Sequence, residues 1–118
     1  MDIVQFTEFC LSKPGVSESF PFGGDTLVFK VSGKIFALTG IDTIPFRVNL
    51  KCDPAWALEL REEYVDIIPG YHMNKKHWNT VTMEGGLEIS LIKKLIDHSY
   101  HLVARSLPKK DQEALGVL

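Results

Sequence analysis

The pattern of hydrophobic and polar positions divides the first third of the chain into one helix and three strands. Apolar residues recur at helical spacing over residues 2–13, with Asp2 placed as an N-cap and Pro14-Gly15 as the stop. Residues 16–20 can form a short strand. The two-residue alternation over residues 27–38, broken by Ser32-Gly33, predicts a tight β-hairpin.

The rest of the chain continues this mixture of strands and helices. In residues 46–51 the apolar side chains alternate with Arg47, Asn49 and Lys51, which predicts a strand with one core face and one cationic face. Asp53-Pro54 has the form of an N-cap followed by a proline at the first helical position, and opens a helix that continues to Tyr64. Further expected elements are strands at 66–68 and 77–83 and helices at 89–107 and 109–115.

These elements predict an α+β fold. We expect a single-domain antiparallel sheet packed against helices, covered mainly on one face by the first helix and by the long helix near the C-terminus. The chain has 118 residues, of which 45% are hydrophobic, so one domain spanning 1–118 can bury a core without metals or disulfides.

Charge and cysteine content limit the functional classes. The formal net charge of −2 provides no overall basic field, so any nucleic-acid contact must come from a local patch. Cys10 and Cys52 lack CxxC spacing, which favours reduced thiols over a disulfide. No apolar run approaches the roughly 18 residues of a membrane span. We therefore expect a soluble, cytoplasmic protein with no membrane contact, as a monomer or weak dimer.

The segment 69–82 concentrates the chain's unusual residues, because it places aromatic, imidazole, amide and ammonium groups between a turn and a β-branched run. Two lysines beside two histidines can form a phosphate-contacting tip, with a second cationic row on the strand 46–51. The alternative is a solvated turn that binds nothing. The candidate nucleic-acid contacts are Arg47, Lys51, Asn74, Lys75, Lys76 and His77.

Aromatic residues allow two interpretations. Tyr71 and Trp78 can stack on bases or anchor a turn in the core, with His72 as a third anchor of the motif. We expect Trp78 to be a core anchor and leave the role of Tyr71 open. Phe20 and Phe22 flank a proline, which suggests a buried corner.

The sequence contains only weak indications of a metal site and none of a catalytic motif. His98 and His101 lie three residues apart on the long helix without the acidic residue of HExxH or an apparent third ligand, and His72 and His77 with Cys52 are a second conceivable set. Structural or surface histidines are the preferred interpretation, with no metal and no cofactor. The sequence has no GxSxG, P-loop or dinucleotide motif, and Ser99-Tyr100 lacks an evident activating base, so we expect no catalytic site.

Several motifs together resemble the MmcQ/YjbR family. The resemblance is carried by residues 20–23, 34–38, 50–54 and 99–100 and above all by Gly70-Tyr-His-Met-Asn-Lys-Lys-His-Trp78. It implies a frataxin-like (CyaY-like) fold and a DNA-binding label of the double-wing type, with no established catalytic residues.

We therefore expect a small non-catalytic module that contacts DNA phosphates through a local basic patch. One alternative is a protein-interaction adaptor that uses the exposed sheet face, and its partner would be another protein. Another is a metal or small-ligand binder of frataxin-like type. Iron binding in that manner needs a dense acidic ridge, whereas the acidic residues here are scattered, namely Glu59, Glu62, Glu63 and Asp66.

Overall fold

The computed structural model describes residues 1–117 and contains six strands and four helices in that range. The elements are α1 (Ile3–Leu11), β1 (Val16–Ser19), β2 (Thr26–Val31), β3 (Lys34–Gly40), β4 (Arg47–Lys51), α2 (Pro54–Glu63), β5 (Ile67–Pro69), β6 (Trp78–Thr82), α3 (Ile89–Ala104) and α4 (Lys109–Leu115). The strands form one sheet in the order β1-β2-β3-β4-β6-β5, and all neighbouring strands are antiparallel. The predicted α+β class is confirmed.

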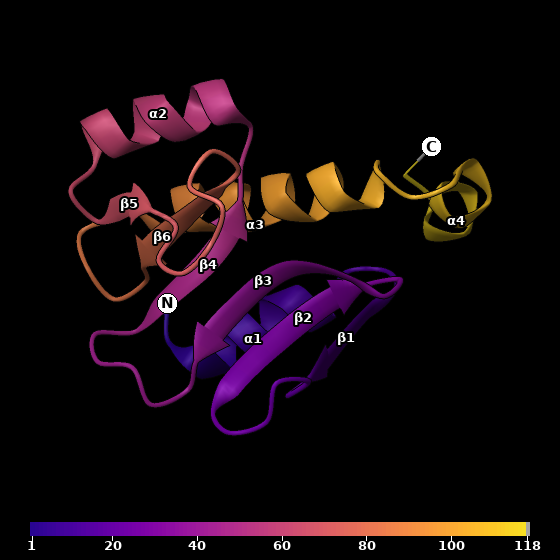
Figure 1. Ribbon diagram of the computed structural model, residues 1–118, viewed down its shortest axis with the longest axis horizontal. Coiled ribbons are helices and arrows are strands. Elements are labelled where there is room, and N and C mark those ends of the chain that lie inside the picture. Colours follow the sequence, from indigo (N-terminus) through magenta and orange to yellow (C-terminus); the bar gives the residue numbers. More distant parts are fainter. Residues whose placement is uncertain (118) are drawn as a thin grey trace.

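The helices cover one face of the sheet and leave the other without a helix within residues 1–117. Figure 1 shows α1 and α3 behind the strands, α2 at the β5 end of the sheet and α4 beyond the far end of α3. The hydrophobic core lies between the sheet and the helices, and its largest fully buried side chains include Tyr100, Phe6, Phe29 and Phe36. We call the opposite side of the sheet the open face.

Local sequence signals explain where the helices begin and end. The Asp2 carboxylate accepts a hydrogen bond from the Gln5 backbone N–H, and the Gln5 side chain accepts one from the Asp2 backbone N–H, which completes a capping box. The Asp53 carboxylate accepts a hydrogen bond from the Trp56 N–H at the start of α2, and Pro54 occupies the first helical position. Gly116 ends α4 with a φ of 75°, a left-handed conformation that glycine adopts without a steric cost.

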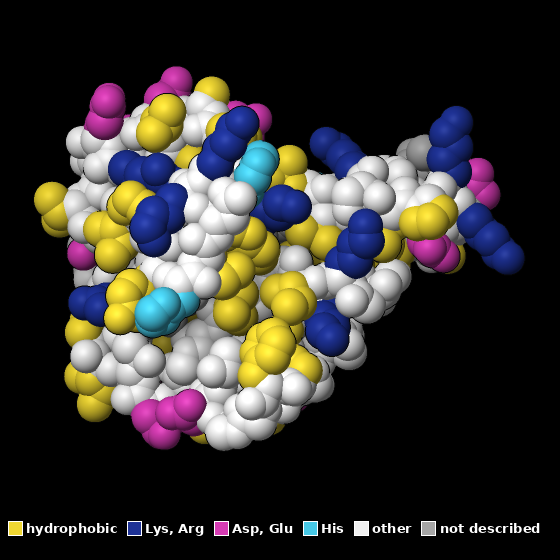
Figure 2. Space-filling view, viewed as in Figure 1, with side chains coloured by type: hydrophobic (Ala, Val, Ile, Leu, Met, Phe, Trp, Pro, Cys, Tyr) yellow, Lys and Arg dark blue, Asp and Glu magenta, His cyan; other side chains and the backbone are white. Residues whose placement is uncertain are grey.

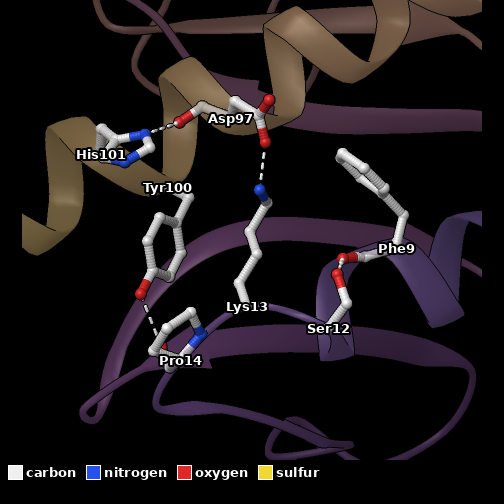
Figure 3. Close-up of polar contacts among 7 residues, drawn as sticks. All are labelled: Phe9, Ser12, Lys13, Pro14, Asp97, Tyr100 and His101. Atoms are coloured by element: carbon white, nitrogen blue, oxygen red, sulfur yellow. Dashed lines mark hydrogen bonds and ion pairs between the residues drawn. The ribbon is translucent and has the colours of Figure 1, made fainter. Parts of the chain in front are cut away.

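A polar cluster ties the end of α1 to α3 (Figure 3). The Lys13 ammonium is ion-paired with Asp97 and lies 4.7 Å from the ring centre of Phe9 and 5.4 Å from that of Tyr100. The Tyr100 hydroxyl donates a hydrogen bond of 2.6 Å to the carbonyl of Pro14. The partly buried cation and the buried phenol therefore both have partners, as burial of polar groups requires.

Ser99 joins two strands that barely pair with each other. Strands β3 and β4 share only two paired positions in the described chain. The Ser99 hydroxyl, which is completely buried, donates to the Phe36 carbonyl at 2.5 Å and accepts from the Lys51 N–H at 2.9 Å. This serine is therefore a structural bridge between the strands.

Both cysteines are buried free thiols. Burial is the main cause that raises the pKa of the Cys10 thiol to about 12, and it likewise raises the pKa of Cys52 to about 12. Such thiols are poor nucleophiles at neutral pH, which agrees with the expectation of reduced cysteines. Across residues 1–117, no helix has the length and apolar character that crossing a membrane would need.

Candidate functional site

The open face is built mainly from β4 and β6. Alternation along β4 places Val48 and Leu50 in the core and leaves Arg47, Asn49 and Lys51 on the opposite side, as the sequence predicted. The segment between β5 and β6 crosses in front of this face (Figure 1). We call this segment, residues 70–77, the covering loop.

A pocket of about 560 Å³ lies between the sheet and the covering loop. Its apolar walls come from Phe22, Ile35, Leu38, Ile68, Tyr71 and Met73, and its polar positions from Thr26, Thr39, Gly40, Thr43, Arg47, Asn49, His72 and Thr80. None of these lining residues is acidic, and Arg47 contributes a guanidinium group.

A β-bulge in β3 determines which apolar residues of this strand line the pocket. Lys30 pairs with Ile35 and Phe29 pairs with Ala37, so Phe36 is an extra residue in β3 without an opposite partner on β2. The bulge lets Phe36 join the core while the residues on either side of the Phe36-Ala37 pair, Ile35 and Leu38, both reach the pocket.

The polar floor of the pocket is a short hydrogen-bond chain. The Thr80 hydroxyl accepts from the Tyr71 N–H at 2.9 Å and donates to the Asn49 Oδ1 at 2.6 Å. The Thr39 hydroxyl donates to the Arg47 carbonyl at 2.6 Å. The Asn49 Nδ2 and the Arg47 guanidinium make no hydrogen bond or ion pair with any other described residue. They are donors available to a ligand.

Arg61, on the last turn of α2, holds the covering loop in place. Its Nε donates to the Asn79 Oδ1 at 2.7 Å, and its Nη2 donates to the carbonyls of Trp78, at 3.2 Å, and Lys75. Arg61 could not be singled out from the sequence, because no local pattern distinguishes it from a solvated arginine at a helix C-terminus. Its acceptors lie 14 to 18 residues further along the chain.

Two residues predicted to contact DNA are used within the loop itself. The Asn74 Oδ1 accepts from the Lys76 N–H at 2.9 Å, and the Asn74 carbonyl accepts from the His77 N–H at 3.2 Å. The Lys75 ammonium donates to the Gly70 carbonyl at 3.0 Å. Asn74 and Lys75 therefore shape the loop, whereas the exposed Lys76 side chain has no polar partner among residues 1–117.

The two aromatic residues of the motif, Trp78 and Tyr71, both differ from buried core anchors. The expectation that Trp78 is a core anchor is wrong, because Trp78 is only partly buried and lies outside the core cluster. Alternation along β6 puts it on the same side as Thr80, where the covering loop rather than a helix shields it. Tyr71 is 66% exposed, and its ring centre lies 4.0 Å from that of His72, whose φ of 58° is left-handed.

The buried corner predicted at Phe20-Pro21-Phe22 is also wrong. Phe22 is 69% exposed and Phe20 is 46% exposed. The turn comes directly before β2, and Phe22 forms a wall of the pocket instead of entering the core. Which side of a hairpin a turn residue joins depends on tertiary packing, and the local sequence does not specify it.

The charges of the open face surround the hydrophobic centre of the face. Figure 2 shows hydrophobic side chains in the middle of this view, Lys and Arg groups around them and Asp and Glu at the margins. The side chains of Arg47, Lys51 and Lys76 have no carboxylate within ion-pair distance among residues 1–117. On this side of the molecule the Lys and Arg groups therefore border apolar surface.

The two helical histidines have structural partners. The His98 Nε2 accepts a hydrogen bond from the Asp53 N–H at 3.0 Å, and the ring packs edge-on against Trp56 at 4.6 Å. The His101 Nδ1 lies 2.8 Å from the Asp97 carbonyl. Within residues 1–117 no three His, Cys, Asp or Glu side chains are grouped to hold a metal ion.

The His98 contact predicts a pH dependence of stability. Burial is the main cause that lowers the pKa of His98 below its usual 6.5, while the nearby Asp53 opposes this shift and His101 adds to it. The unfolded chain therefore binds more protons as the pH falls through 6.5, so this group's contribution to stability is lost between 6.5 and the lower folded pKa. We expect His98→Gln to show a smaller loss of unfolding free energy between pH 7 and 5 than the unmodified protein, measured by urea denaturation.

His72→Gln is the matched control, because His72 is exposed on the covering loop. It should retain the full pH dependence. Equal pH dependence in His98→Gln and the unmodified protein would contradict the account.

The fold and the site define a small α+β domain with a helix-covered face and a pocketed open face. A profile of the YjbR family matches residues 11–102. The chain therefore belongs to the YjbR family, as the sequence motifs indicated.

Similar proteins cover nearly the whole chain. YbdF of Escherichia coli O157:H7 is 43% identical over 104 residues, which are 87% of this chain and 84% of YbdF. YjbR of Escherichia coli K12 is 34% identical over 116 residues, 98% of either chain.

Solved structures match as well. The crystal structure of Deinococcus radiodurans protein DR2400 superposes with a TM-score of 0.91 at 40% identity, covering 98% of this chain and 88% of that one. A crystal structure of a Pseudomonas syringae protein gives a TM-score of 0.75 at 32% identity, with 87% and 99% covered. Neither the family's name nor these names state an activity, so function is inferred from the open face.

Proposed function

We propose that the protein is a non-catalytic DNA-binding module that contacts phosphates through the open face. The observation that carries this proposal is a set of cations on that face and its covering loop, Arg47, Lys51 and Lys76, whose side chains have no acidic partner in residues 1–117. Unpaired Lys and Arg side chains on one surface are the usual means of phosphate contact. The acidic side chains that are visible in this view lie at its margins (Figure 2).

The geometry changes the number of phosphate contacts expected. Four cations were candidates on sequence grounds, but the Lys75 ammonium already donates to the Gly70 carbonyl. Of these four candidates, Arg47, Lys51 and Lys76 have side chains without a hydrogen-bond or ion-pair partner in residues 1–117. Each neutralised phosphate contributes about −0.9 to the slope of log affinity against log salt, so three contacts predict a slope of about −2.7 on duplex DNA.

The test is a salt titration of DNA affinity, followed by fluorescence anisotropy of a labelled duplex. Lys76→Ala and Arg47→Ala should each flatten the slope by about 0.9 and weaken binding to all sequences about equally. Lys109→Ala on α4 is the control, because Lys109 is exposed at the far end of the molecule, and it should leave the slope unchanged.

Two outcomes would refute the proposal. One is the absence of binding to any duplex at about 50 mM salt, where non-specific binders have micromolar affinity or better. The other is a slope that Lys109→Ala flattens as much as Lys76→Ala does. A protein that co-purifies and covers the open face would then support the adaptor role in its place.

A further inference from the structure

We propose that the pocket of the open face binds a small organic anion, a carboxylate attached to an aromatic or short aliphatic body. The inference goes beyond phosphate contact and does not depend on DNA binding. It starts from the pocket's volume of about 560 Å³, which lies within the range of roughly 300–1,000 Å³ typical of small-molecule sites.

The apolar walls of the pocket favour a ligand with an apolar part. Ile35 and Leu38 present aliphatic groups from β3, because the bulge at Phe36 brings both to this side. Phe22 and Tyr71, both more than half exposed, line it from the turn before β2 and from the covering loop. Large exposed aromatic side chains that converge on a hollow are what an apolar ligand would cover.

The free hydrogen-bond donors of the pocket favour a ligand with an anionic group. The Arg47 guanidinium and the Asn49 Nδ2 belong to alternate residues of β4, line the same pocket and have no partner in the described chain. The Asn49 amide is held in place, since its Oδ1 accepts from the Thr80 hydroxyl, which in turn accepts from the Tyr71 N–H. A fixed amide N–H₂ and a planar guanidinium that line one pocket can each donate to an oxygen of a carboxylate.

The charge of the pocket excludes cationic ligands. No acidic residue lines it, and the lining residues Arg47 and His72 are the basic ones. A ligand with an ammonium group would therefore meet no counter-charge, whereas a carboxylate would pair with Arg47. Charge complementarity and the apolar walls together define the ligand class as an amphipathic carboxylate.

The experiment titrates the full-length protein with 3-phenylpropionate, without DNA, and follows backbone amide chemical shifts. We expect saturable shifts with a Kd of about 1 mM, as suits an unoptimised ligand of this size, centred on Leu38, Arg47, Asn49, Tyr71 and Thr80. Two matched probes separate the ligand's parts. The neutral amide 3-phenylpropanamide and the ringless anion acetate should each bind at least about tenfold more weakly.

Two exposed residues provide variants that should fold normally. Arg47→Gln should raise the Kd for 3-phenylpropionate at least about tenfold, whereas Lys109→Gln on α4 should leave it unchanged. Phe22→Ala should also weaken the binding of 3-phenylpropionate. It should leave the slope of log DNA affinity against log salt unchanged, because Phe22 carries no charge. That variant therefore distinguishes failure of this site from failure of the DNA proposal.

Shifts that are absent, that map to the α1 and α3 side of the sheet, or that are equally strong with all three probes would overturn the inference. So would an unchanged Kd in Arg47→Gln.

Discussion

Ser99→Ala is expected to lower the free energy of unfolding by about 3 kcal/mol. The substitution removes the hydroxyl that joins the Phe36 carbonyl to the Lys51 N–H, and it leaves both backbone groups unpaired beneath α3. An unsatisfied buried donor or acceptor costs about 1–3 kcal/mol, and two are created here. Urea denaturation followed by circular dichroism measures the change.

Two further variants isolate the hydrogen bonds. Ser90→Ala, an exposed position in the first turn of the same helix, should change stability by less than about 0.5 kcal/mol. Ser99→Cys retains a group at this position, but the thiol is larger than the hydroxyl and forms only weak hydrogen bonds, so it should be nearly as destabilising as alanine. If Ser99→Ala were as stable as Ser90→Ala, the strands would not depend on this bridge.

Arg61→Ala is expected to cost about 3 kcal/mol and to release the covering loop. The side chain donates to Asn79 and to the carbonyls of Lys75 and Trp78, and hydrogen bonds from charged donors contribute about 1.5–3 kcal/mol each, with incomplete additivity. The Asn79 side chain is buried and its Nδ2 already has no partner within residues 1–117, so loss of Arg61 would leave the whole amide unsatisfied.

Arg61→Lys tests the geometry directly. A lysine keeps the charge but lacks the planar fork that reaches three acceptors, so it should recover less than half of the lost stability. Arg105→Ala is the control, because Arg105 is exposed at the end of α3 and should be close to neutral. Hydrogen exchange should show faster exchange of the His77 and Trp78 amides in Arg61→Ala, and unchanged exchange would argue against this role.

Features that depend on neighbouring residues could be predicted from the sequence. The N-caps Asp2 and Asp53 and the glycine stop at Gly116 act through contacts a few residues away, so local spacing reveals them. The alternation in β4 correctly separated core from open face, because a strand with one buried face must alternate.

Features that depend on tertiary packing could not be predicted in this way. Trp78 and Phe22 were assigned to the core because large aromatics usually lie there, yet both belong to the side of the sheet without a helix. The identity of that side is set by where α1 and α3 pack. The role of Arg61 likewise depends on backbone carbonyls distant in sequence, which no local pattern encodes.

Amide chemical-shift mapping with a short DNA duplex tests whether the open face is the binding surface. We expect the shifts to concentrate on β4 and the covering loop, at Arg47, Asn49, Lys51 and Lys76 above all, and to diminish with added salt. Shifts confined to α1, α3 or α4, or no shifts at low salt, would contradict this expectation.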